Sequence, residues 1–468
     1  MSTVPADLRG RVGARLRARC TVAAVAALVV VGLGGCSDDP DPRTDPDPSA
    51  SPDSADPSAV EIPPDLGRSF DRLLNRRAAA LLSGDRVTFA QGLVRSDEAF
   101  RAGQAAYFDN LRHLPMSELR FDLDPRSLVR SGDDYWGVVE VTLQLAGFDR
   151  EPVVTVDRYR FSPLGDDARR FGLSSVTDAD WEERNDVFSQ PWDMGPIQVR
   201  SGVGVLGIFD AESVRVSDAL IDSVERGIGN VAALVPYEWS RSVVVYALSD
   251  TEFLSSIEDP PGGHPERLDG VAFSVETSPS SGEIAATRFV LHPRMLDRAR
   301  VERDRLVRHE LTHVAMGEHD DHAPVWLSEG LAEYVSVRPL APQDRMIADA
   351  ALAAAKGGEI TELPDDENFN GPDSAVHYGV AWWACEYLAL TYGPESLWTI
   401  LDGLDATDAA GEPGAVDARL EGMTGINSRT LARKSAKLMI ATFDPGYEPA
   451  PEPSNDPTTA TDGPDVEG

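Results

Sequence analysis

The stretch RHELTHVAMGEHDDHAPVWLSEGLAEY, residues 308–334, lies where the alternating pattern of strands gives way to helices. Within it His309 and His313 are four residues apart, about 40° around a helix axis, so both imidazoles point to one side. Glu310 lies between the two sides, and we expect it beside the histidines and not buried. Gly317 supplies a helix stop. Apolar residues at helical spacing mark the roughly opposite, core-facing side: Val307, Leu311, Val314 and Ala315.

Two histidines at this spacing suit a metal ion. Zinc takes neutral imidazole nitrogens, and a carboxylate beside a bound water, here Glu310, can take the proton of that water. A catalytic zinc needs a third protein ligand, which separates a metal site from a chance pair of histidines. Glu329 follows His313 by sixteen residues, enough for a reversing loop and a second helix. Glu333, on the same face of that helix, is placed to accept the other ring N–H of a liganding histidine.

The HELTH run followed by WLSEGLAEY resembles the gluzincin metallopeptidases, the clan of thermolysin and the membrane alanyl aminopeptidases. Within that clan it is most similar to the bacterial peptidase-MA-like group, over residues 198 to about 440. In this family the motif histidines and the glutamate of the Trp-Leu-x-Glu-Gly run bind zinc. The resemblance implies that His309, His313 and Glu329 are the zinc ligands. Glu310 is then the general base.

The chain also departs from the aminopeptidases. They carry a Gly-x-Met-Glu-Asn signature whose glutamate captures the amino terminus of the substrate, and this chain has none. Exopeptidase action is therefore unsupported, and an endopeptidase is expected. The interval between the histidines and Glu329 is also a few residues shorter than the corresponding interval in the aminopeptidases. The resemblance therefore applies only to the core geometry of the site.

The run HYGVAWWACEYL, residues 377–388, offers a donor for the oxyanion that peptide hydrolysis develops. Tyr378 resembles the tyrosine of the Tyr-x-x-Gly-type helix that supplies this donor in the aminopeptidases, although the glycine is displaced to Gly379. His377 is the other candidate. A third possibility is that Tyr378 packs as an ordinary amphipathic aromatic residue.

Two further histidine stretches have structural interpretations. HDDH, residues 319–322, is either a second metal cluster or, as we expect, a solvated loop between the two ligand helices. The stretch TRFVLHP, residues 287–293, corresponds to the gluzincin edge strand, whose unpaired backbone groups bind the substrate. His292 within it is expected to be structural.

The first globular part, residues 65–190, begins with helical patterns and continues with alternating stretches, each broken by a turn signal. Helices followed by an antiparallel meander predict an α+β domain. By pattern alone it resembles the cone-shaped nuclear-transport-factor-like domains. The resemblance implies that its sheet is curved and wraps a helix.

The second part, residues 198–443, alternates strands with one helix and is largely helical from Asp297 onward. We therefore expect a gluzincin-like domain with a mixed sheet followed by a mostly helical half. The fold class expected for the whole chain is α+β.

The N-terminal residues 1–35 resemble a bacterial lipoprotein leader. An apolar run too short for a comfortable membrane span ends in Leu-Gly-Gly before Cys36. The resemblance implies cleavage before Cys36 and its lipidation. An ordinary secretory signal with an incidental cysteine, or an uncleaved anchor, are the alternatives. The basic residues before the apolar run are Arg9, Arg11, Arg15, Arg17 and Arg19.

Composition indicates which segments are disordered and which kinds of binding partner are disfavoured. Residues 36–64 and 444–468 are rich in Pro and Asp or Glu with little to bury, and we expect both to be disordered. The formal net charge of −35 disfavours nucleic acid and anionic membrane surfaces as partners. Cys385 lies in an apolar helical run and is expected to be an inert core thiol, so no disulfide framework is predicted.

These patterns predict a zinc metalloprotease held at the extracytoplasmic side of the cell membrane by its N-terminal lipid alone. It would hydrolyse peptide or protein substrates through a zinc-activated water with Glu310 as the base. The alternatives are a non-catalytic binding or assembly lipoprotein on the same scaffold and a zinc hydrolase of non-peptide substrates. The sequence indicates no particular cleavage preference or oligomeric state.

Overall fold

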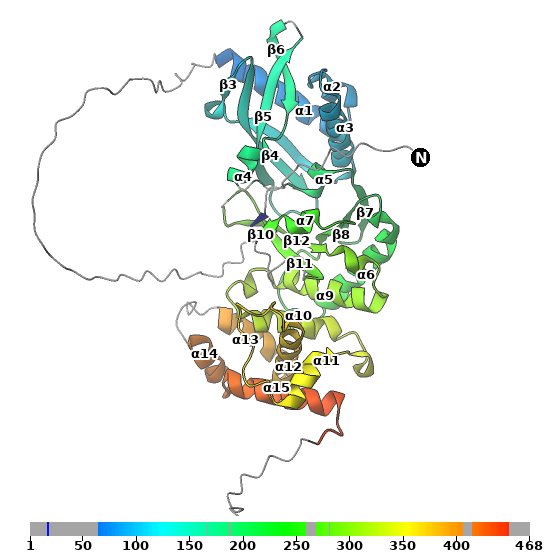
Figure 1. Cartoon of the computed structure of the whole chain (residues 1–468), viewed down its shortest axis with the longest axis vertical. Helices are drawn as coiled ribbons and strands as arrows, with labels where there is room; N and C mark the ends of the chain where they lie inside the picture. The colour runs from blue at the N-terminus through cyan, green and yellow to red at the C-terminus, as the bar shows by residue number, and fades with distance from the viewer. Residues whose placement is uncertain are drawn as a thin grey trace, which may run out of the picture.

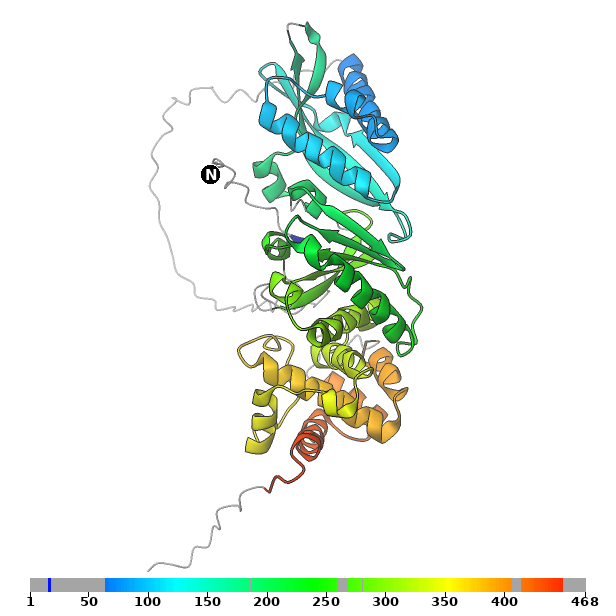
Figure 2. The same cartoon turned by 90° about the vertical axis from the view of Figure 1, so that its right-hand side faces the viewer.

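The computed structural model shows an α+β protein, which confirms the expected fold class (Figure 1). Three layers follow one another along its longest axis: helices on a curved antiparallel sheet, a mixed sheet, and a helical half (Figures 1 and 2). Cys36, the predicted tether up to residue 63, and residues 449–468 lie outside the described residues. The structure describes residues 16–17, 64–165, 167–185, 187, 189–258, 268–279, 281–405 and 414–448.

The first domain has the expected order of helices and then strands. Its helices are α1 (Pro64–Ser83), α2 (Arg86–Gln91) and α3 (Glu98–His113). The strands β2 (Met116–Leu123), β4 (Asp134–Leu145), β5 (Val153–Leu164) and β6 (Asp167–Ser175) pair antiparallel in that order, with β3 (Val129–Ser131) added to β4. Short helices η1 (Pro125–Ser127), α4 (Ala179–Arg184) and α5 (Pro191–Met194) complete the domain.

Alternation along the strands builds the core of this domain. In β2 the side chains of Leu119, Phe121 and Leu123 are buried, and the residues between them are exposed. The buried face packs against α1, where the ring of Phe70 stacks on that of Phe161 at 4.1 Å. A curved sheet with one apolar face therefore packs around the helix, as the resemblance to the cone-shaped domains implies.

The second domain begins with a mixed sheet of five strands. Its order is β11 (Gly270–Glu276), β12 (Ile284–Leu291), β9 (Val243–Ala247), β8 (Val205–Phe209) and β7 (Gln198–Gly202). The strands β12, β9 and β8 run parallel, and the two outer pairings are antiparallel. The helices η2 (Ser213–Val216), α6 (Ser217–Ala232) and α7 (Glu252–Ser255) lie between β8 and β10 in the chain. A short strand, β10 (Ile257–Glu258), pairs with β1 (Leu16–Arg17).

The sheet order corrects one expectation. The stretch assigned to the substrate-binding edge forms β12, which lies between β11 and β9 and has both of its edges paired. The edge strand is β11. The next residue after β12, His292, is structural as expected, since its Nδ1 accepts the backbone N–H of Arg294 at 3.1 Å and caps the following helix.

Both faces of the mixed sheet are covered. Alternate residues of β8 and β9 point to opposite sides, and every residue of both strands is buried. Val205, Phe209 and Val245 join the core formed with the following helices, whereas Leu206 and Tyr246 join the core of the first domain. The first domain and the sheet thus share one apolar core, although their sequences read as separate units.

A buried ion pair crosses this shared core. Arg288 on β12 donates to Asp149 of the β4–β5 turn at 2.9 Å, and both side chains are almost fully buried. The guanidinium also donates to the hydroxyl of Tyr246 at 2.7 Å and to the side-chain carbonyl of Gln190 at 3.1 Å. The pair therefore fixes how the two domains meet.

Removing one partner of this pair should destabilise the whole protein. We expect Asp149→Ala to lower the free energy of unfolding by about 3–5 kcal/mol, because Arg288 is left buried without its counter-ion. The double variant Asp149→Ala/Arg288→Met should recover much of that loss. Denaturant unfolding measures both, with the exposed ion-pair variant Asp65→Ala as the control. A loss below about 1 kcal/mol for Asp149→Ala would contradict the interpretation.

The described residues from Pro293 to Phe443 are largely helical, close to the expectation of a helical half from Asp297 onward. The helices that build the metal-site region are α9 (Arg300–Met316), η4 (Gly317–Asp320), α10 (Val325–Val337) and α12 (Ser374–Tyr392). Around them lie α8 (Pro293–Leu296), η5 (Pro342–Asp344), α11 (Asp349–Gly357), α13 (Ser396–Asp405), α14 (Ala415–Thr424) and α15 (Ser428–Phe443). Among the described residues, no helix has the length and apolar character needed to cross a membrane.

The helical half is closely packed around α10 and α12. A Cβ atom added at Gly330 of α10 would lie 2.5 Å from the carbonyl oxygen of Ala381 on α12, so only glycine permits this approach. Cys385 is fully buried at the same contact and is a free thiol. Beyond α15, the hydroxyl of Tyr447 donates to the carbonyl of Lys356 at 2.8 Å, which places the first residues of the predicted tail against α11.

Candidate metal site

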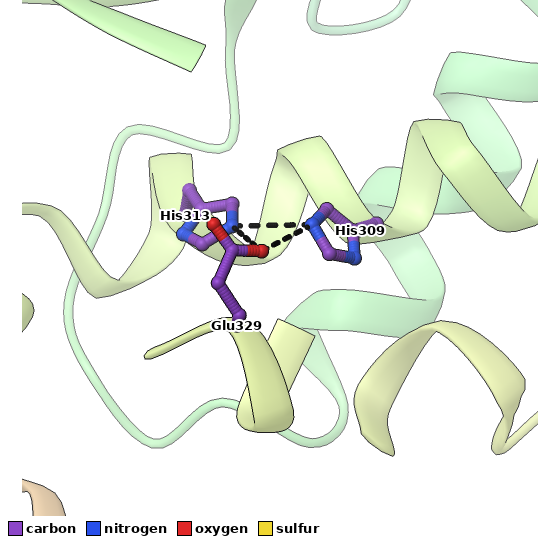
Figure 3. Close-up of side chains that lie close together, drawn as sticks. All are labelled: His309, His313 and Glu329. Carbon is purple, nitrogen blue, oxygen red and sulfur yellow. Dashed lines mark hydrogen bonds and ion pairs between the residues drawn. The ribbon is translucent and has the colours of Figure 1, made fainter. Parts of the chain in front are cut away.

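Three side chains from two helices bring their donor atoms together (Figure 3). Nε2 of His309 lies 3.1 Å from Oε2 of Glu329 and 3.3 Å from Nε2 of His313. Nε2 of His313 lies 3.6 Å from the same carboxylate oxygen. His309 and Glu329 are buried, and His313 is partly buried. This group can hold a metal ion.

The local sequence explains the convergence. The predicted core side of α9 is buried, with Val307 and Leu311 at 0% exposure, so the histidines face the other way. The helix ends at Met316, and Gly317 follows as its C-cap. The short helix η4 then reverses the chain, and α10 returns with Glu329 facing α9 (Figure 3).

The structure corrects the expected position of Glu310, which is 4% exposed and therefore buried. Its carboxylate accepts the backbone N–H of Ala272 on β11. A Cβ atom added at Gly270 would lie 2.8 Å from Oε1 of Glu310, so glycine leaves the room for this side chain. Burial raises the pKa of Glu310, against the opposing effect of the two histidines. The sequence pattern did not predict the burial of Glu310, because the strand that covers it, β11, lies far earlier in the chain.

Glu333 lies behind the first histidine. Its Oε1 is 3.2 Å from Nδ1 of His309, the ring nitrogen that does not face Glu329. Its other oxygen accepts from the guanidinium of Arg305, which also donates to the carbonyl of Met346 at 3.1 Å. The Arg305–Glu333 pair is placed to fix the orientation of the His309 ring.

Asp320 takes the corresponding position behind the second histidine. Its Oδ2 lies 3.5 Å from Nδ1 of His313 and also accepts the hydroxyl of Ser328. The expectation that the whole HDDH stretch faces water was therefore wrong for Asp320. The flanking histidines are exposed, with His319 stacked on Tyr237 at 3.7 Å and His322 beside Asp405. The signal in the sequence was an acid one helical turn past the stop at Gly317.

Neutralising Asp320 should weaken metal binding without preventing it. We expect Asp320→Asn to lower metal affinity by about 10- to 100-fold, because a carboxylate behind a liganding histidine orients the ring and raises its basicity. Competition with a chromophoric chelator measures the affinity, and Glu318→Gln in the same turn is the control. An unchanged affinity would show that Asp320 has no such role.

The two candidates for an oxyanion donor occupy different places. The ring of Tyr378 lies 6.2 Å from that of His309 and packs edge-on against Phe369 at 4.9 Å. Burial, with the nearby carboxylates of Glu329 and Glu310, raises the pKa of Tyr378 well above its usual value, so its hydroxyl keeps its proton. His377 instead turns Nδ1 to the carbonyl of Phe369 at 2.8 Å. Tyr378, not His377, adjoins the three-donor group.

The three donors change one another's pKa values. Burial alone would lower the pKa of His309, but Glu329 and Glu333 outweigh it and raise that pKa to about 9. Burial alone would raise the pKa of Glu329, yet the two histidines hold it far below its usual range. A metal ion must therefore displace protons from the histidines, and its affinity should rise with pH up to the region of their pKa values.

The arrangement combines a cation site, a buried carboxylate and a protonated phenol within one region of α9, α10, α12 and β11. Compared with models of known protein families and with curated proteins, the sequence matches none.

Proposed function

We propose that the protein is a zinc metallopeptidase that cleaves within peptide chains. The observation that carries the proposal is the convergence of His309, His313 and Glu329, with Glu310 directly beside them. Two imidazoles and one carboxylate are a ligand set of catalytic zinc sites, which keep a further position open. Four-coordinate zinc with bonds of about 2.0–2.1 Å separates its donors by about 3.3–3.4 Å. The donor separations of 3.1, 3.3 and 3.6 Å fit that size.

Bound zinc would supply a water of pKa near 7 and polarise the carbonyl of the substrate. The side chains of the protein would transfer the protons. Glu310 takes the proton of the attacking water on its carboxylate and returns it to the leaving amine. Tyr378 keeps its proton and stabilises the developing oxyanion with a hydrogen bond from its hydroxyl group.

The edge of the mixed sheet supports a peptide as the substrate. Within the described part of the chain β11 pairs with β12 alone, so its other edge can add an extended chain. The carboxylate of Glu310 accepts the N–H of Ala272, so the proposed base lies against this strand. A substrate strand there would run beside the proposed base. This geometry favours peptides over non-peptide substrates.

We place this activity at the extracytoplasmic face of the cell membrane, with the lipid on Cys36 as the only attachment. The proposal rests on the leader and the acidic tether of the sequence. The first domain covers one face of the sheet and so serves at least as a support for the site.

Removal and return of the metal tests the function directly. We expect the protein to cleave members of a mixed peptide library, to lose this activity after dialysis against a chelator, and to regain it with about one equivalent of zinc. Mass spectrometry of the products reports internal cleavage. A protein that binds zinc and cleaves no peptide would favour the binding or assembly alternative, and hydrolysis of model esters alone would favour a non-peptide substrate.

A further inference from the structure

A pocket in the first domain, away from the metal site, is lined by four arginines. It lies between α1, α2 and β6 and has a volume of about 330 Å³. Arg72, Arg76 and Arg77 come from α1 and Arg170 from β6. No acidic residue is among the described residues that line it. In a chain with 78 acidic and 43 basic residues, such a grouping runs against the overall composition.

Three of the four arginines of the pocket have no counter-ion. Within the described ranges, Arg72, Arg76 and Arg170 make no ion pair, and Asp71 forms none with its neighbour Arg72. Among the described residues, the paired arginines of the domain are Arg68 with Asp65, Arg86 with Asp109, Arg120 with Glu118 and Asp122, Arg130 with Asp133, Arg158 with Asp178, and Arg160 with Asp134. Other arginines of the domain, such as Arg101, are unpaired as well among the described residues, so what distinguishes the pocket is that four arginines line one cavity with no acidic residue among them.

Arg77 is the buried member of the group. It is 4% exposed, and its guanidinium lies 4.3 Å from the centre of the Phe89 ring. Its Nη2 donates to Gln104, but Nε and Nη1 have no hydrogen-bond partner in the described structure. A buried cation with two unsatisfied donors is costly unless an anion completes it. These two atoms are closed off from solvent, so an anion in the pocket would be attracted by the positive charge of Arg77 and would not bond to them directly.

We propose that this pocket binds a phosphate-bearing ligand. Guanidinium groups match phosphate oxygens with two parallel hydrogen bonds, and four such groups call for more negative charge than one carboxylate carries. The volume suits a small phosphorylated molecule or the headgroup of a phospholipid. The exposed amide of Gln91, which also lines the pocket, can donate to a further oxygen. This site is independent of the metal site and of the proposed peptidase activity.

Calorimetric titration of the full chain at fixed ionic strength tests the proposal with three soluble probes. Inorganic phosphate and pyrophosphate represent a free phosphate ligand, and glycerophosphoglycerol represents a phospholipid headgroup. The wild type should bind at least one of them, and the preferred probe distinguishes the two sources. Arg72→Gln/Arg76→Gln should weaken binding by about tenfold per arginine, roughly a hundredfold together.

The control is Arg101→Gln, an exposed arginine of α3 outside the pocket, which should bind like the wild type. Arg72 and Arg76 are exposed on α1, so the double variant is expected to fold, and its thermal unfolding checks this. The absence of binding to all three probes would overturn the proposal. Equal binding by the wild type and a folded double variant would overturn it as well.

Discussion

The Glu310→Gln variant is expected to retain its metal and lose peptide cleavage by roughly 100- to 10,000-fold, the contribution of a positioned general base. The amide of glutamine has nearly the shape of the carboxylate and can still accept the N–H of Ala272. It cannot take a proton from the attacking water. Turnover should therefore fall while the fold and the three donors stay in place.

The measurement compares cleavage rates, metal content and thermal unfolding in the same preparations. Because burial raises the pKa of Glu310, the neutral amide should leave the thermal stability unchanged or slightly higher. Glu302→Gln, an exposed acid on the same helix, is the matched control and should cleave normally. Cleavage by Glu310→Gln at the rate of the wild type would exclude Glu310 as the base.

The Glu329→Ala variant is expected to lose the metal itself. It removes one of three ligands, so we expect metal affinity to fall by more than the roughly 10- to 100-fold that supporting residues contribute. The remaining histidines would also lose the carboxylate that holds Nε2 of His309 at 3.1 Å. Cleavage should disappear together with the metal.

Metal per mole of purified protein measures this effect, with about one zinc expected in the wild type. Glu329→Gln keeps the shape of the side chain but replaces the charged oxygen ligand, so it should also bind metal poorly if the carboxylate is the ligand. Full metal content in both variants would show that Glu329 is not a ligand. If the folded wild type took up no zinc, His309 and His313 would not form a metal site. That result would favour the alternative of a non-catalytic binding or assembly protein.

Local spacing explains why much of the site could be predicted from the sequence. His309 and His313 share a helix face because of the helical period, and Glu329 and Glu333 share another for the same reason. The glycine at 317 and a short polar loop allow the chain to return on itself. The alternating stretches likewise predicted which segments become strands, so helices followed by an antiparallel sheet could be expected from the sequence.

Contacts between distant segments could not be predicted from local spacing. The burial of Glu310 depends on β11, whose Gly270 and Ala272 lie next to it only because the sheet pairs β11 with β12. Strand order decides which strand has a free edge, and periodicity within a strand carries no information on its neighbours. The expected edge was therefore placed on β12, one strand too far inward.

The sequence by itself determined the α+β class, the two helices that carry the donors, and the side of each helix on which the donors lie. Helical and strand periods are properties of short segments, so they can be read without the fold. Only the tertiary structure decided that Asp320 supports His313, that the first domain shares a core with the mixed sheet, and that four arginines surround one pocket. Each of these depends on the packing of segments distant in the chain, which no local pattern records.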